Sequence, residues 1–126
     1  MTTPILAPEN AVTMIRGTSK TLTVTVSNPD GTPTNLTGGR MVLTVKPNFW
    51  TDLPLIQKLT TDPSQGVITV PREGIAEFYL VPADTIGLDT KEYVFDVWLV
   101  TATGERYAVV PPSALLLTAN VTYLPI

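Results

Sequence analysis

The sequence contains no cysteine and no histidine among its 126 residues. Their absence excludes thiolate nucleophiles, structural zinc sites and acid–base catalysis by imidazole. Charge is also scarce: 15% of the residues are charged, against about a quarter in an average globular protein, and the net charge is −3. Because the chain has no basic stripe to hold phosphates, we expect no nucleic-acid partner.

Long apolar runs are missing as well. No apolar stretch approaches the roughly 18 residues that a membrane-spanning helix needs. The N-terminus has no positively charged segment and carries two prolines, Pro4 and Pro8. We therefore expect no membrane partner, no signal peptide and synthesis in a cytoplasm.

With so little charge, the surface cannot be covered by Lys and Glu. Either threonine, the commonest residue, supplies much of the exterior, or part of the surface is buried against partners. Both explanations can hold together. The composition alone does not decide between them.

The length of the chain and the absence of a linker predict one domain over residues 12–126. Residues 1–11 predict an extended N-terminal arm, because Pro4 and Pro8 block a helix. Its apolar residues, Ile5 and Leu6, have no periodic context. The arm either lies on its own domain or reaches a neighbouring subunit.

From Val12 onward the hydrophobic pattern has a period of two, which is typical of half-buried strands. One helical turn is expected over residues 82–88, where a proline and an acid precede Gly87. Pro111 and Pro112 are expected to break the chain between the last two strands. Strands are expected over residues 20–26, 40–46, 55–59, 67–70, 75–80, 92–100, 106–110 and 115–122. About eight short strands separated by turn residues predict an all-β protein, an antiparallel β-sandwich.

The strand over residues 92–100 has two largely apolar faces. Such a pattern predicts a central strand that is covered on both sides. One face carries Tyr93, Phe95, Val97 and Leu99, and the other carries Val94, Asp96, Trp98 and Val100.

Asp96 is a carboxylate in the middle of this apolar strand. It could be an acid with a perturbed pKa, or it could bond backbone donors or an arginine such as Arg106 across a hairpin. No second acid, histidine or nucleophile stands in register with it. We therefore expect no catalytic residues and a protein that is not an enzyme.

Two further acids, Asp84 and Asp89, flank Gly87 and could offer oxygen ligands to a metal. The dense acidic spacing of a calcium loop is missing, so we expect them to cap a helix and to form turns. The Gly38-Gly39 pair lacks the rest of a phosphate-binding motif and predicts a turn. We expect neither a metal nor a cofactor.

Phe49 and Trp50 are adjacent aromatics in a loop bounded by prolines. They could fold over the end of the sandwich as a lid on the core, or they could anchor a partner. Together with Ile5 and Leu6 of the arm, they are the candidate partner-binding residues.

The order of the motifs resembles a known family over most of residues 12–122. The motifs are IRGTSK (15–20) before the alternating strand, DGTP (30–33) before LTG (36–38), VLTVK (42–46) followed by PLIQK (54–58), and GIAEF (74–78), LVPADT (80–85) and EYVFDV (92–97). In this order they resemble the immunoglobulin-like N-terminal domain of tailed-phage upper baseplate proteins and related small phage virion proteins.

The resemblance implies an immunoglobulin-like sandwich and a non-enzymatic virion structural protein. Such a protein docks onto other virion proteins in the baseplate, tail, neck or fibre adaptor, or decorates the capsid. It also implies a homo-oligomer, a trimer or a ring, located in the virion after synthesis in the host cytoplasm.

Two other functions remain open. A host-surface carbohydrate-binding or adhesin-like module would use Phe49, Trp50 and Tyr107 as platforms on which sugar rings stack. An acid-dependent hydrolase built around Asp96 would need a second carboxylate at a suitable distance.

Overall fold

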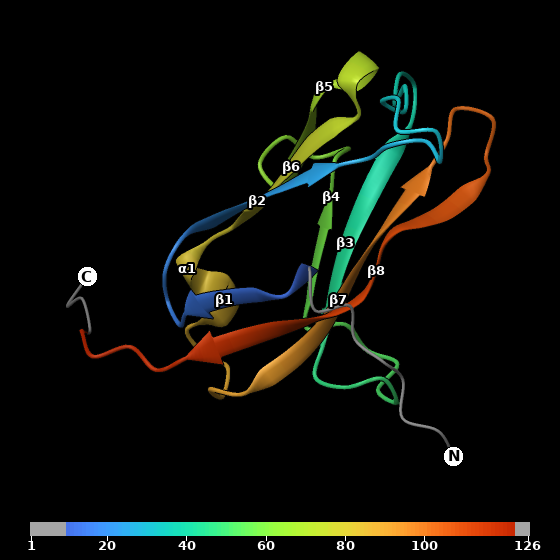
Figure 1. The fold of residues 1–126 in the computed structure, drawn as a ribbon. Coiled ribbons are helices and arrows are strands. Elements are labelled where there is room, and N and C mark those ends of the chain that lie inside the picture. The colour runs from blue at the N-terminus through green and yellow to red at the C-terminus, as the bar shows by residue number, and fades with distance from the viewer. Residues whose placement is uncertain (1–9, 123–126) are drawn as a thin grey trace.

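The computed structural model describes residues 10–122 as two β-sheets packed face to face (Figure 1). Ile5 and Leu6 of the expected arm lie outside the described residues. The strands are β1 (Val12–Ile15), β2 (Lys20–Thr25), β3 (Arg40–Lys46), β4 (Ile56–Leu59), β5 (Gly66–Val70), β6 (Ile75–Leu80), β7 (Glu92–Val100) and β8 (Arg106–Thr118). A 3-10 turn, Pro71–Glu73, precedes β6, and the helical turn α1, Pro82–Thr85, follows it. No helix in the described part of the chain has the length and apolar character that a membrane span requires.

The topology of the two sheets is immunoglobulin-like. One sheet has the strand order β1-β8-β7-β3-β4 and the other the order β2-β6-β5. This division places β3, β7 and β8 opposite β2, β5 and β6. The variable-type immunoglobulin sandwich has the same division, and β4 takes the place of its additional strand beside β3. All neighbours are antiparallel except β1, which runs parallel to β8. The predicted all-β, immunoglobulin-like sandwich is confirmed.

The strands β3, β6 and β7 have the bounds that the sequence predicts, whereas the end of the chain differs. The two strands expected over 106–110 and 115–122 form one strand, β8, so the expected break at Pro111 and Pro112 is wrong. Between the pairs Phe95–Ser113 and Val97–Val110 the register shifts. A β-bulge there takes up both prolines, which have no N–H to donate to a regular ladder.

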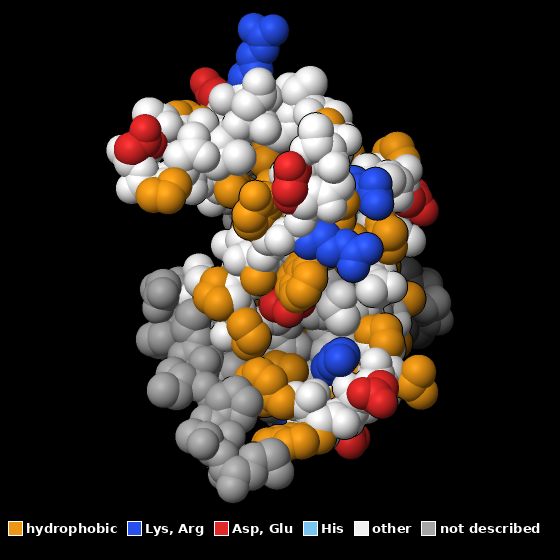
Figure 2. Space-filling view, turned by 90° about the vertical axis from the view of Figure 1, so that its right-hand side faces the viewer, with side chains coloured by type: hydrophobic (Ala, Val, Ile, Leu, Met, Phe, Trp, Pro, Cys, Tyr) orange, Lys and Arg blue, Asp and Glu red, His pale blue; other side chains and the backbone are white. Residues whose placement is uncertain are grey.

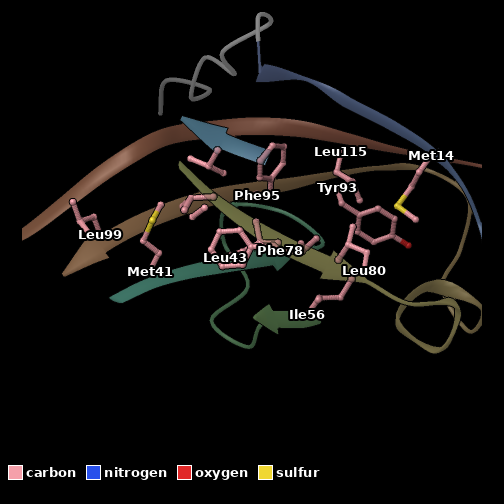
Figure 3. Packing of buried hydrophobic residues seen from close by; sticks show 14 of the residues in the cluster. Met14, Met41, Leu43, Ile56, Phe78, Leu80, Tyr93, Phe95, Leu99 and Leu115 are labelled. Atoms are coloured by element: carbon pink, nitrogen blue, oxygen red, sulfur yellow. The ribbon is translucent and has the colours of Figure 1, made fainter. Parts of the chain in front are cut away.

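The core lies between the sheets and consists of apolar side chains from both inner faces (Figure 3). Phe78 of β6 is fully buried, and Leu43 of β3 and Leu115 of β8 are fully buried opposite it. Burying one large apolar side chain contributes about 1.5–3 kcal/mol to stability. The sandwich is therefore closed by apolar packing, without the disulfide that joins the sheets in antibody domains.

Hydrogen bonds and one ion pair fix the corner between β6 and β7. The Asp84 carboxylate accepts a hydrogen bond from the Val81 N–H at 2.8 Å and pairs with Lys58 of β4 at 2.9 Å, with both side chains mostly buried. The Tyr93 hydroxyl donates to the backbone oxygen of Asp89 at 2.6 Å, as in the tyrosine corner of immunoglobulin-like domains. The capping role expected of Asp84 is confirmed, whereas Asp89 contributes its backbone oxygen to the corner.

The Lys58–Asp84 pair gives a first prediction. Replacing Asp84 by Ala leaves a mostly buried ammonium without its partner and removes a cap, so unfolding should become easier by about 2–4 kcal/mol. Chemical denaturation measures this loss. In a Lys58→Met background the same substitution should cost clearly less; an equal cost in both backgrounds would mean that the pair contributes nothing.

Candidate functional site

The two faces of β7 differ sharply in exposure. The inner face, with Tyr93 and Phe95, is buried, whereas the outer face is half-buried or exposed. On the outer face the Trp98 side chain is 43% exposed. The expectation that β7 is covered on both sides is therefore wrong within residues 10–122. An apolar sheet face remains accessible.

The bulge in β8 determines what lies beside Asp96 on this outer face. Asp96 stands opposite the two prolines, Pro111 and Pro112, between the ladder pairs on either side. On its other side it pairs in register with Thr44 of β3. Because bulges interrupt the regular ladder, the carboxylate sits next to a local irregularity of the sheet.

The Asp96 carboxylate accepts a hydrogen bond from the indole N–H of Trp98, with Nε1 and Oδ2 3.0 Å apart. Within the described residues it forms no ion pair with Arg106, one of the partners that the sequence suggested. Burial raises the pKa of Asp96 above its ordinary value, while the Trp98 hydrogen bond and the positive charge of Lys46 oppose this rise. Trp98 and Asp96 thus form a linked pair on the outer face.

An open hollow of about 480 Å³ surrounds this pair over β3, β4 and β7. Its lining mixes aromatic, basic, acidic and amide side chains: Trp98, Lys46, Arg106, Asp96, Asp52 and Gln57. The hollow can therefore offer hydrogen-bond donors and acceptors around one aromatic ring. Figure 2 shows hydrophobic side chains in the middle of one face of the molecule with basic and acidic side chains beside them.

A second, smaller hollow shares Lys46 and Asp96 with the first and extends it toward Phe49 and Pro112. We call the two together the β7 outer surface. It joins part of the predicted Phe49-Trp50 loop to the outer face of the five-stranded sheet.

The Phe49-Trp50 loop has an ordered local structure. The Asn48 Oδ1 accepts hydrogen bonds from the backbone N–H groups of Trp50 and Thr51, each at 2.9 Å. The two rings meet edge to face, with centroids 6.2 Å apart. Phe49 is half-buried, whereas Trp50 is 59% exposed, so Trp50 is not a lid on the core. That either residue binds a partner stays a prediction.

Trp98 and Lys46 are site residues that the sequence does not predict. The sequence does place Trp98 beside Asp96, because residues two apart in a strand lie on the same face of it. The apolar residues beside Trp98 instead predict a strand covered on both sides. Within residues 10–122 no group of three acidic side chains could hold a metal ion.

Comparisons with known proteins add little. No protein-family model and no curated protein matches the chain. A solved structure titled "Structure or murine CRIg" covers 94% of this chain and 95% of its own, at 13% identity and a TM-score of 0.40. A likeness this weak carries no argument about function, and the immunoglobulin-like fold rests on the strand topology.

The raised pKa of Asp96 gives a second prediction. At pH values between the ordinary pKa of an aspartate and the raised pKa of Asp96, folding takes up protons. The free energy of unfolding should therefore fall as the pH rises through this window. Asp96→Asn keeps an acceptor for Trp98 and removes the charge, so it should raise the melting temperature at pH 7 but not near pH 3. Thermal unfolding across this pH range measures the effect.

Asp52→Asn is the matched control, because Asp52 is an exposed carboxylate of the same surface. It should change the melting temperature little at either pH. A gain for Asp96→Asn that is the same at pH 3 and pH 7 would contradict a cost of burying the charge.

Proposed function

We propose that this chain is a non-catalytic structural domain of a phage virion that docks onto other virion proteins through the β7 outer surface. The domain supplies a rigid sandwich, and the docking contact is made by Trp98 and its charged neighbours. The partners are other virion structural proteins, in the baseplate, tail, neck or fibre adaptor, or on the capsid.

The observation that carries this proposal is the accessible outer face of β7. Its pattern is typical of a strand buried on both sides, yet Trp98 is 43% exposed. In protein–protein interfaces, aromatic and arginine side chains near the centre are the residues that most often contribute most of the binding energy. Trp98 and Arg106 line the same hollow, which supports protein docking.

The low charge and the motif order support the rest of the proposal. A domain with 15% charged residues has little of the exposed charge that keeps a surface free of partners. The resemblance to small virion proteins supports assembly as a trimer or ring in the particle. A catalytic role has weaker support, because Asp96 is engaged by Trp98 and the second acid in the hollow, Asp52, is exposed.

A carbohydrate-binding module is the alternative, and the exposed aromatic side chains favour it. Trp50, Trp98 and Tyr107 are all at least 43% exposed, and rings of this kind stack on the apolar faces of sugars. Asp96 and Gln57 beside Trp98 could accept and donate hydrogen bonds to hydroxyl groups.

Docking is tested by incorporation into particles. Mass spectrometry of purified virions of the phage that encodes the chain should detect it at a fixed ratio to the other structural proteins. Trp98→Glu should reduce incorporation about tenfold or more, because a central aromatic of an interface typically contributes 2 kcal/mol or more. The melting temperature of the Trp98→Glu variant should stay close to that of the unchanged protein.

Val70→Glu is the control, because Val70 is an exposed apolar residue of the opposite sheet. It should be incorporated normally. Absence of the protein from particles would overturn the virion role, whereas equal incorporation of both variants would overturn the docking surface.

The carbohydrate alternative predicts a different result. Binding to a glycan array that Trp98→Ala abolishes, with the fold intact by circular dichroism, would replace docking by glycan recognition. We expect the array to remain blank, in keeping with a protein partner.

A further inference from the structure

The outer face of the five-stranded sheet changes character along its strands. An apolar line of residues in register crosses four of these strands: Leu59, Val42, Trp98 and Ala108. Directly opposed residues share a face of a sheet, so these side chains lie on the outer face with Trp98. Two residues further along β7, Val100 stands between Arg40 of β3 and Arg106 of β8. The apolar line therefore has two arginines along one of its sides.

The other side of the apolar line is polar and acidic. There Asp96 of β7 pairs in register with Thr44 of β3, which pairs with Gln57 of β4. Asp96 is half-buried and accepts the hydrogen bond of the Trp98 indole. The outer face thus presents positive charge on one side of an apolar centre and hydrogen-bonding groups on the other.

Arg40 and Arg106, which we call the arginine pair, are both exposed. Because β7 lies between their strands, the Cα atoms of the pair are about 10 Å apart, twice the spacing of neighbouring strands. Arg106 lines the hollow around Trp98, and Arg40 lines another hollow of about 330 Å³. An acidic group above Val100 would lie between the two guanidinium groups, each of which can bind a carboxylate through two N–H groups.

No acid within residues 10–122 forms an ion pair with the arginine pair. The one ion pair in this part of the chain joins Lys58 to Asp84. Glu105, next to Arg106, accepts hydrogen bonds from two threonine hydroxyl groups of the hairpin between β7 and β8. Asp52 lies in the loop after β3, whereas the arginine of β3 is at the start of that strand. An acidic group on a partner is therefore complementary to this side of the surface.

A different protein fits this surface better than a nucleic acid or a second copy. The phosphates of a nucleic acid would be repelled by Asp96 and by the net charge of −3. A second copy would bring its own Asp96 to the arginine pair, but that carboxylate is half-buried and already bonded to Trp98. A protein can offer an accessible acid and an apolar side chain about 7 Å apart. Alternate residues of an extended segment have this spacing, and so do the arginine pair and the apolar line, because they are two residues apart along β7.

We propose that the β7 outer surface recognises another virion protein through an acidic side chain that binds the arginine pair and an apolar side chain that packs on Trp98. This partner chemistry rests on the proposed function. The contact also sets the orientation in which the partner docks, because the arginines lie on only one side of the apolar line and complementary charges fix the register of an interface.

Charge reversal in the phage that encodes the chain tests this contact. The double variant Arg40→Glu/Arg106→Glu should reduce incorporation into particles about tenfold or more, because its glutamates repel the acid of the partner. The melting temperature of this double variant should stay close to that of the unchanged protein, since both residues are exposed. Lys20→Glu/Arg72→Glu is the matched control, with the same change of charge beside the three-stranded sheet, and should be incorporated normally.

Infectious revertants that retain both glutamates of the arginine double variant identify the partner. They should carry substitutions of an acidic by a basic residue in the gene of another virion protein. Equal incorporation of the two double variants, or revertants changed only within this chain, would overturn the acidic contact and leave the docking surface standing. A dimer in light scattering that the arginine double variant dissociates would assign the surface to a second copy. Absence of the unchanged protein from particles would overturn the acidic contact together with the proposed function.

Discussion

The mutual burial of two apolar sheet faces is the constraint on which the rest of this structure depends. No cysteine joins the sheets, so Phe78, Phe95 and their neighbours must exclude water by packing alone. Because side chains alternate along a strand, burying Phe95 and Val97 forces Asp96 and Trp98 outward. The same packing that closes the domain therefore also sets which residues its outer surface presents.

Much of the fold could be predicted from the alternation of residues. Both β3 and β6 begin directly after a glycine, and a proline follows within two residues of their ends, so the sequence indicates their period and their bounds. The unbroken β8 could not be foreseen, because Pro111 and Pro112 normally end a strand. Their tolerance depends on the bulge opposite Asp96, which exists only once β7 and β8 are paired.

Only part of the candidate surface could be predicted from the sequence. The alternation of residues places Asp96 and Trp98 on the same face of β7, but whether a second layer covers that face depends on tertiary structure. The hydrogen bond between them joins residues two apart on one face, a spacing that also suits unrelated side chains. The loop at Phe49 and Trp50 left two interpretations open, since local sequence does not determine how a loop lies on its domain.

The bulge at Pro111 and Pro112 has a consequence for the outer border of β8. Among residues 10–122, β1 pairs with β8 only over Leu115–Thr118, so the first half of this long strand has no described neighbour there. Two prolines in that stretch remove the donors that an aggregating strand would need, and the bulge twists the border away from flatness. This border of β8 is therefore a poor template for edge-to-edge pairing with another strand, the contact from which amyloid-like stacking is built.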